Sequence, residues 1–443
     1  MAQETFIFEL DEKPPTFKTV IYGFQWVMVS IPAVAVFSAL CSNALGLDPA
    51  AQISFSQRLL IVTGLGTILQ SLVGHRYPIL EGPSAALLLT FVILAPQGLP
   101  VIEGGLIFGS LFLMVAGKFQ WFKWVSSLFT PNVVGVILIL VAFTLLPFVY
   151  PMLIGISPSH PYGELSVCGF SLLIIFFVSF LSHWLRGFLQ TTSMLAGIIF
   201  GLILFLLQGR VTLALVKESP WLAFPSPSLG VWPAFSLTAV LSLVCTNLAV
   251  MINSVGSIQG MSEVVTKEGL EDRIHRGICV NGAGGLIAAL LGVVGLVSAS
   301  ISTGVVLVSR VASRHVLTMC GGIMIICAFV PKLWAVLTAI PSSVVGAVLF
   351  VTLSSQLMAG MTVIMSGKKQ IERREYFTVG FPVLLGTIIA FLPKPFFDLF
   401  PATIASVVSN GLVMGLVFSL LSEHLLFRSR RGKKKTSPGK RNA

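Results

Sequence analysis

The sequence is poor in charged residues, which occupy only 10% of its 443 positions. A soluble protein of this size is typically about 25% charged. The chain is instead 55% hydrophobic, and apolar stretches such as residues 136–149 recur along nearly all of it. Because a helix needs roughly 20 apolar residues to cross a bilayer core of about 30 Å, this composition excludes an ordinary soluble domain. It predicts an all-α integral membrane protein that contacts the lipid bilayer.

Residue patterns that carry catalytic or metal chemistry are also missing. The six cysteines stand in apolar surroundings without paired spacing, so we interpret them as packing residues. The sequence has no Cys/His metal spacing, no Gly-rich phosphate loop, and no nucleophile-elbow or metalloprotease signature. We therefore predict that the chain is not an enzyme and that it needs no metal or cofactor.

Apolar segments separated by polar breaks number about fourteen. They start near residues 20, 55, 82, 101, 132, 165, 193, 234, 277, 303, 317, 342, 376 and 402. If both termini are cytoplasmic, most of the 28 Lys and Arg residues fall on the cytoplasmic side, and the exceptions are Arg58, Arg210, Lys217, Lys332 and Lys394. This asymmetry is the bias seen in membrane proteins, so it predicts a multi-pass protein of the cell (inner) membrane with cytoplasmic termini.

These segments divide the chain into two halves. We expect a cytoplasmic segment at 1–19, a first half of seven spans at 20–210, an extracellular linker at 211–233 and a second half at 234–427. The remaining residues, 428–443, form a basic tail that is too short to bury a core. We interpret the tail as a disordered anchor for anionic lipid rather than a nucleic-acid-binding segment.

Two features repeat at a separation of seven segments. Pro131 to Gly135 opens the fifth segment and Pro341 to Gly346 opens the twelfth, and both combine a proline with a Val-Val-Gly step. The two shortest segments, the third and the tenth, are also seven apart. Because seven is odd, the second half would cross the membrane upside down relative to the first. The sequence thus predicts a seven-plus-seven inverted repeat.

The third and tenth segments are predicted to be broken spans. Two prolines and a glycine forbid a helix before Pro83, which suits the first position of a helix running to about Ala95. The alternation of small, polar and β-branched residues over 298–304 favours a short strand in the tenth segment. We expect two such strands to pair near the midplane, each followed by a half-helix whose amino end faces a cavity.

Glu81 is the one carboxylate that the sequence places deep in the membrane. Five extended residues at about 3.3 Å each separate it from Arg76 at the cytoplasmic surface. A deep carboxylate normally faces an internal cavity, so Glu81 is predicted to bind substrate and to be the candidate for proton coupling. Two structural alternatives are that it caps the following half-helix or pairs with Arg76. None of the six histidines is predicted at this depth.

The eighth segment carries a pair of polar residues on one helix face. Asn253 and Ser257 are four residues apart, and Asn253 lies ten residues before Glu263, about 15 Å deep if the segment is helical. An asparagine offers both a donor and an acceptor to a planar heterocycle. The alternative is a hydrogen bond between helices, which contributes about 0.6 kcal/mol on average in membranes.

The order of these blocks resembles the nucleobase-cation symporters, also called nucleobase-ascorbate transporters, across essentially the whole chain. The blocks that carry the resemblance are Gly82-Pro83-Ser84, Pro131–Gly135, Gly256, Arg276–Gly285, Val311–Arg314 and Ile340–Gly346. The resemblance implies a secondary active transporter for a nucleobase or a related purine or pyrimidine. It further implies alternating access between a core domain (spans 1 to 4 and 8 to 11) and a gate domain (spans 5 to 7 and 12 to 14). The resemblance implies protons as the coupling ion, with sodium as the alternative. It also implies a homodimer formed through the gate domain.

The resemblance also implies a substrate site between the eighth span and the two broken spans. The positions that match it are Ala85, Asn253, Ser257, Ile301 and Ser302. The chain is a divergent member, because the family usually has Glu at position 253, Gln or Glu followed by Asn at 301 and 302, and an aromatic residue at 85. Our hypothesis is that Glu81 supplies the carboxylate that the eighth span lacks. The alternative function is an anion carrier of the related sulfate-transporter type.

Overall fold

The computed structural model describes residues 6–121, 128–157, 159–185, 190, 192–227, 232–366, 373–397, 399–401, 405 and 407–427. The predicted basic tail and the first five residues of the chain lie outside this part. Within it the chain is mostly helical, and the only sheet in the described part has two strands of three residues each. The predicted all-α membrane class is therefore confirmed.

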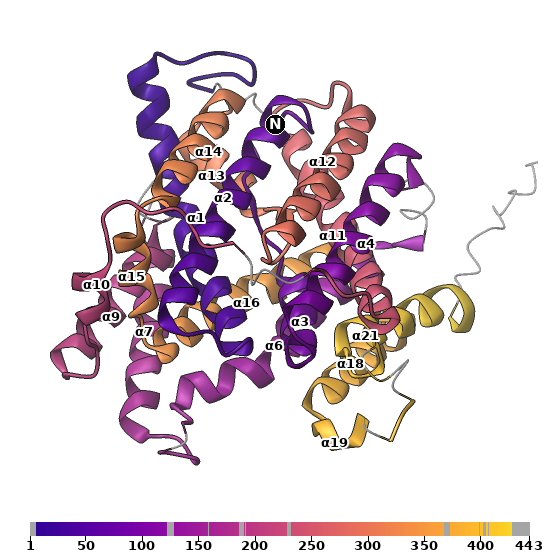
Figure 1. Cartoon of the computed structure of the whole chain (residues 1–443). Helices are drawn as coiled ribbons and strands as arrows, with labels where there is room; N and C mark the ends of the chain where they lie inside the picture. The colour runs from indigo at the N-terminus through magenta and orange to yellow at the C-terminus, as the bar shows by residue number, and fades with distance from the viewer. Residues whose placement is uncertain are drawn as a thin grey trace, which may run out of the picture.

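Described helices coincide with the predicted apolar segments (Figure 1), and the predicted start of the fourteenth, near residue 402, lies outside the described residues. In chain order they are α1 (Thr16–Ala44), α2 (Pro49–Leu72), α3 (Ala85–Leu94), η1 (Ala95–Gln97), α4 (Leu99–Lys118), α6 (Pro131–Ile154), α7 (Leu165–Trp184), α9 (Ser193–Leu207), α10 (Ala214–Glu218), α11 (Leu237–Val264), α12 (Leu270–Leu290), α13 (Ile301–Ser309), α14 (Arg314–Ala328), α15 (Pro331–Thr338), α16 (Ser342–Met365), α17 (Arg373–Glu375), η2 (Tyr376–Gly380), α18 (Phe381–Phe391), α19 (Lys394–Phe397), α21 (Gly411–Leu421) and η3 (Ser422–Leu426). The two strands are β1 (Glu81–Pro83) and β2 (Leu296–Ser298).

Seven of the described helices are long and apolar enough to cross a membrane, or eight if α14 and α15, which meet at an 82° bend, form one span. Large apolar side chains stand on their outer faces, such as Phe176 on α7 (72% exposed) and Leu384 on α18 (65% exposed). A soluble monomer rarely exposes so much apolar surface. The protein is therefore a multi-pass membrane protein.

Two long helices, α2 and α12, are too polar to be among those seven, and both are buried inside the bundle. Along α2 the buried polar side chains include Gln57, Arg58, Thr67 and Gln70, and α12 buries Asn281. Arg58, which was predicted on the extracellular side, is buried within α2 at 5% exposure. Polar side chains are costly in lipid, so these groups find partners inside the protein. Gln70 donates to Asn281 on α12, Thr67 accepts from the backbone of β1, and Gln57 donates to the carbonyl of Ala328 on α14.

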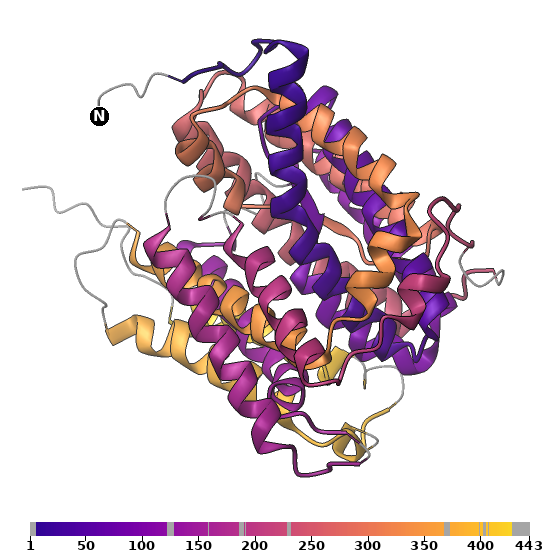
Figure 2. The same cartoon turned by 90° about the vertical axis from the view of Figure 1, so that its left-hand side faces the viewer.

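The helices pack as two groups (Figure 2). One group contains α1 to α4 and α11 to α14 together with both strands, and the other contains α6, α7, α9, α16, α18 and α21. In Figure 2 the second group lies at the lower left, and the long indigo helix α1 runs beside it. Helix α1 contacts both α9 and α16, so it forms part of the boundary between the groups.

Glycines allow the closest helix pairs to touch through their backbones. A Cβ atom added to Gly64 on α2 would lie 2.7 Å from the carbonyl oxygen of Gly321 on α14, and one added to Gly321 would lie 2.5 Å from that of Gly64. Gly135 and Gly360 make the same reciprocal contact between α6 and α16, at 2.7 and 2.8 Å. Small residues at such crossings are the usual basis of tight helix packing in membranes.

The two strands pair antiparallel, with Glu81 opposite Ser298 and Pro83 opposite Leu296. The predicted pairing is therefore present, but the predicted boundaries are partly wrong. Pro83 lies in β1, and α3 begins at Ala85 after Ser84, whose hydroxyl accepts from the backbone N–H of Leu87 at 3.4 Å.

The predicted strand over 298–304 is also largely wrong, because β2 ends at Ser298 and α13 begins at Ile301. The buried residues of this segment are Ser302, Val305 and Val306. Their spacing is that of one helix face, and it outweighs the alternation that favoured a strand.

We expect Gly64→Ala and Gly321→Ala each to lower the free energy of unfolding by about 1–3 kcal/mol, because the added methyl group would overpack a backbone contact. Thermal unfolding of the detergent-purified protein measures this. Gly322→Ala is the matched control, since a Cβ atom there meets nothing within 4 Å. Equal stability of all three variants would contradict the backbone contact.

Candidate functional site

Helices from both halves of the chain meet at the crossing of β1 and β2. Strand β1 packs against α1 and α2, and β2 packs against α11 and α12. Backbone hydrogen bonds continue the pairing at both ends of the strands, from Ala299 N to Leu80 O at 2.9 Å and from Ser84 N to Gly295 O at 3.0 Å. The broken segments thus satisfy each other's backbone inside the bundle, as a membrane interior requires.

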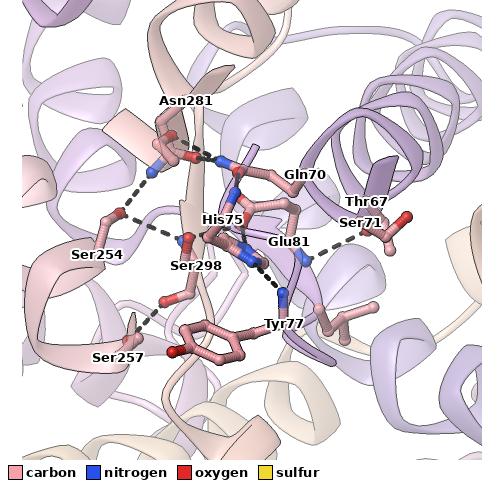
Figure 3. A network of polar contacts seen from close by, with 12 residues as sticks. Thr67, Gln70, Ser71, His75, Tyr77, Glu81, Ser254, Ser257, Asn281 and Ser298 are labelled. Carbon is pink, nitrogen blue, oxygen red and sulfur yellow. Dashed lines mark hydrogen bonds and ion pairs between the residues drawn. The ribbon is translucent and has the colours of Figure 1, made fainter. Parts of the chain in front are cut away.

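Glu81 points into this crossing and is 1% exposed (Figure 3). Its Oε1 accepts a 2.6 Å hydrogen bond from the Ser298 hydroxyl, and its backbone N–H donates to Thr67 Oγ1 at 3.2 Å. The Nε2 atom of His75 lies 3.7 Å from the same Oε1. Oε2 has no hydrogen-bond partner in the described part of the chain. The carboxyl group therefore has one occupied oxygen and one unoccupied oxygen.

His75 is fully buried beside Glu81, in the connection between α2 and β1. Its Nδ1 accepts from the backbone N–H of Tyr77 at 3.0 Å, and its Nε2 has no hydrogen-bond partner among the described residues. The Arg273 guanidinium on α12 donates to the carbonyl of His75 at 3.0 Å and lies over the Tyr77 ring. The backbone around His75 is thus anchored to α12.

A chain of neutral polar groups surrounds the pair. Gln70 Nε2 donates to Asn281 Oδ1 at 3.0 Å, and Asn281 Nδ2 donates to Ser254 Oγ at 2.5 Å. Ser254 Oγ accepts from the backbone N–H of Ser298 at 3.4 Å, while Gln70 Oε1 accepts from the backbone N–H of His75 at 3.2 Å. The network therefore connects α2, α12, α11 and β2, as Figure 3 shows.

Three of the six predicted site residues, namely Glu81, Ser257 and Ser302, lie at this crossing. The Ser257 hydroxyl donates to the Ser298 carbonyl at 2.8 Å and to the Asn253 carbonyl at 3.0 Å. The Ser302 hydroxyl accepts from the backbone N–H of Leu80 at 3.0 Å, next to Glu81. Asn253 is partly buried one turn before Ser257 on α11. The remaining two, Ala85 and Ile301, are the first residues of α3 and α13 and are half-buried and exposed, respectively.

The expected surroundings of Glu81 are corrected in three respects. It caps no helix, since Ser84 caps α3, and Arg76 donates to the Leu72 carbonyl instead of pairing with it. The segment before it is turned, with φ of 56° at Arg76, so the count of five extended residues does not apply. Three other carboxylates in the described part are 4–6% exposed, namely Glu103, Glu375 and Glu423, so burial within the protein does not by itself single out Glu81.

His75, Ser298 and the amide network were not predicted as site residues. His75 stands only six positions before Glu81, but its contact with Glu81 depends on the turn between them. A sequence signal was available in α2 and α12, where Gln70 and Asn281 interrupt otherwise apolar or small-residue faces. Polar residues within spanning segments commonly face the bundle interior.

A cavity of about 650 Å³ lies beside the crossing, between α11 and the ends of α6 and α16. Its lining includes Met251, Ile252, Val255, Gly256, Gln259, Gly260, Glu263, Pro131, Val134 and Val363. None of the six predicted site residues is among its lining residues. Ser257, on another face of α11, binds the carbonyl of Ser298 on β2, and Asn253 is one turn before it. A second cavity of about 330 Å³, lined in part by Ser38, Ser42 and Ser342, lies between α1, α2, α15 and α16.

Two broken segments that meet around a buried polar site, beside a cavity and within a bundle of apolar helices, define a membrane transport protein. The sequence agrees, because residues 17–395 match the family model Xan_ur_permease, described as the permease family. The chain belongs to this family, which is that of the nucleobase-ascorbate transporters, so the resemblance read from the sequence is confirmed. It is a transporter and not an enzyme.

Proteins named as permeases are similar in sequence to this chain over nearly its whole length. The putative purine permease CPE0397 of Clostridium perfringens is 27% identical over 96% of this chain and 93% of its own length. The uric acid permease PucJ of Bacillus subtilis is 25% identical over 95% of both chains. Both alignments extend over the two halves of the chain.

Solved structures with the same fold belong to transporters of another kind. The transmembrane domain of the cyanobacterial bicarbonate transporter BicA matches with a TM-score of 0.57 at 15% identity, covering 93% of this chain and 98% of that one. The murine anion transporter Slc26a9, in its inward-facing state, matches with a TM-score of 0.63 at 14% identity, covering 92% of this chain and 68% of that one. At these identities the likeness concerns the fold alone.

Asn281→Ala should lower the free energy of unfolding by about 1–3 kcal/mol, because it leaves the buried donor of Gln70 and the hydroxyl of Ser254 without their shared partner. Thermal unfolding in detergent measures the change. Asn43→Ala removes the same group at an exposed position and should change stability little. A similar small effect for both variants would mean that the network contributes no stability.

Proposed function

We propose that this chain is a permease for a nucleobase or a related purine or pyrimidine. The observation that carries the proposal is the polar crossing beside a cavity, in a chain whose relatives include proteins named purine and uric acid permeases. The crossing places hydroxyl and amide groups from α11 next to the amino ends of α3 and α13. A planar heterocycle with carbonyl oxygens and ring N–H groups offers complementary donors and acceptors.

The proposal includes fourteen spans arranged as a seven-plus-seven inverted repeat. Its support is that helix contacts occur in equivalent pairs: α2 with α14 and α12 with α4, α1 with α14 and α11 with α4, α7 with α9 and α18 with α21. The two Val-Val-Gly motifs support the same inverted repeat. Gly135 on α6 faces Ile364 on α16, and Gly346 on α16 faces Leu153 on α6. Ile364 and Leu153 stand at equivalent positions of the two helices. The antiparallel pairing of β1 with β2 fits the same two-fold relation.

Transport would then occur by alternating access, with the group that contains the strands as the core domain and the other group as the gate domain. With both termini in the cytoplasm of the cell (inner) membrane, the larger cavity opens toward the cytoplasm and the smaller toward the outside. The two cavities occupy equivalent places in the repeat, one between α11 and the start of α6 and the other between α1 and the start of α16. A rocking motion of one domain against the other would enlarge one cavity as it closes the other.

Within this scheme the substrate would lie at the edge of the larger cavity, against Asn253 and the amino ends of the two half-helices. Asn253 would supply a donor and an acceptor, and Ala85 and Ile301 would contact the ring faces. Ser257 and Ser302 would hold the strands in place, because their hydroxyls already bind backbone groups of the crossing. A homodimer formed through the gate domain remains a prediction from the family.

Glu81 is proposed as the coupling residue, with a proton or sodium as the coupling ion. The support is its burial, its unoccupied Oε2 and its position one strand away from Ser257. An anion carrier remains a separate hypothesis, for which the structure supplies no further argument beyond the shared fold.

Thermal unfolding of the purified protein in the presence of candidate ligands tests the substrate class. A ligand that binds only the folded state at a concentration of 100 times its Kd should raise the free energy of unfolding by about 2.7 kcal/mol. We expect uric acid, xanthine, uracil or another nucleobase to stabilise the protein and sulfate and bicarbonate to have no effect. Stabilisation by the anions alone would refute the nucleobase proposal.

Asn253→Ala is expected to weaken nucleobase binding by at least about tenfold, because it removes a paired donor and acceptor worth about 1.4 kcal/mol or more. Equilibrium binding of radiolabelled nucleobase to purified protein measures this. Gln208→Ala is the control, since it removes the same amide from an exposed helix end. Unchanged affinity in Asn253→Ala would exclude Asn253 from the site.

A further inference from the structure

Among the residues that the structure describes, two buried side-chain atoms at the strand crossing have no hydrogen-bond partner. They are Glu81 Oε2 and His75 Nε2, and both residues are at most 1% exposed. We propose that His75 and Glu81 together form a proton-binding pair that excludes sodium, and that Ser298 links this pair to the substrate-binding helix α11. This inference rests on the proposed function, since it specifies the coupling ion and the route of coupling.

The hydrogen bonds of His75 determine its protonation pattern. Its Nδ1 accepts from the Tyr77 backbone N–H, so that nitrogen carries no proton and the hydrogen of the neutral ring is on Nε2. This N–H faces Glu81 Oε1, 3.7 Å away. A second proton on the ring would break the bond to Tyr77. A proton that enters the pair therefore binds the carboxylate of Glu81, and His75 is the positioning residue.

The same arrangement is unsuited to a sodium ion. A hard cation needs several oxygen ligands, and the oxygens nearest to Glu81 are already in use. Ser298 Oγ donates to Oε1, and Thr67 Oγ1 accepts from the Glu81 backbone while it donates to the Thr63 carbonyl. Two hydrogens thus point toward the carboxylate, one from Ser298 and one from His75. A sodium ion beside the Glu81 carboxylate would lie against the N–H edge of the His75 ring, which carries a partial positive charge.

Ser298 is the link because its two ends bind different parts of the protein. Its hydroxyl donates to Glu81, and its carbonyl accepts from Ser257 on α11. A carboxylate is a stronger acceptor than a neutral carboxyl group. Protonation of Glu81 therefore weakens its hydrogen bond with Ser298 on β2. The effect is transmitted through the Ser298 carbonyl to the Ser257 hydroxyl, which also lies at hydrogen-bond distance from the carbonyl of Asn253.

Few other charges can account for a pH effect at the pair. From α12, Arg273 binds the carbonyls of His75 and Arg76, and it is the charged group that faces the pair most directly. Helix α2 presents the neutral Thr67 and Gln70, and its buried Arg58 lies more than two turns earlier, near Glu103. The buried residues of α1 and α11 include no charged side chain in the described part.

The pH dependence of binding tests the link, with radiolabelled uric acid as the probe. If binding and protonation are coupled one to one, the affinity of the wild type should change by about tenfold per pH unit over the coupling range. Glu81→Gln should remove this dependence beyond the titration of the ligand itself, which is the same for every variant. Ser298→Ala should still bind but with a weaker dependence than the wild type. Glu164→Gln and Ser171→Ala, on the other helix group, should behave like the wild type.

A wild-type pH dependence in Glu81→Gln or in Ser298→Ala would overturn the proposal, and so would an increase in affinity on adding sodium that Glu81→Gln abolishes. If Glu81→Gln does not fold, Glu81→Asp serves instead, because it keeps the carboxyl group but withdraws it from Ser298. The expected result is then a shifted pH range. An unshifted range would count against the pair.

Infrared difference spectra of the purified protein between two pH values separate this proposal from the proposed function, because they need no nucleobase. A protonated carboxyl band that titrates in the wild type, moves in His75→Gln and is absent from Glu81→Gln supports the pair even if no nucleobase binds. Nucleobase binding without such a band supports the permease function and refutes the pair.

Discussion

The structure depends on one constraint, which is that a backbone interrupted within a membrane must find its hydrogen bonds inside the protein. The chain is interrupted twice, and each interruption supplies the missing partners of the other through the pairing of β1 with β2. The two halves of the sequence are therefore joined at the place where both lose their helical bonds. The buried polar side chains of α2, α11 and α12 gather there because the free peptide groups already make that region polar.

The sequence predicted the helices well because each is a long apolar run, and composition alone locates such runs. Glu81 and Ser257, which the sequence singled out as polar residues in apolar surroundings, and Ser302, which the family resemblance implied, all lie at the strand crossing, and their roles in binding and coupling stay predictions. The sequence did not predict His75, because the contact between His75 and Glu81 depends on a turn in which Arg76 has a positive φ. Positive φ is uncommon in residues other than glycine, so no local sequence pattern predicts this turn. The sequence misplaced β2 because Ile301, Thr303 and Val305 alternate like a strand, while burial follows the helical spacing of Ser302, Val305 and Val306.

The differences between this chain and the pattern expected for the family concern the region around Glu81 and Asn253. The resemblance implies a carboxylate on the eighth span where this chain has Asn253, and a buried carboxylate, Glu81, is on strand β1 instead. A charge on a helix and a charge on a strand reach the same region from different sides. The strand position places the acid next to a histidine and a serine, His75 and Ser298. A divergent binding site and a conserved fold are thus compatible.

The register of the short strand pair has a consequence for how this chain can change over evolution. Successive residues of a strand face opposite sides, so a shift of one residue would turn Glu81 away from Ser298 and His75 and bring Gly82 into its place. Substitutions in the connections to β1 and β2 are compatible with the register, but insertions and deletions are not. We therefore expect a change in the length of either connection to disturb the pairing of Glu81 with Ser298 more than a change of residue within it does.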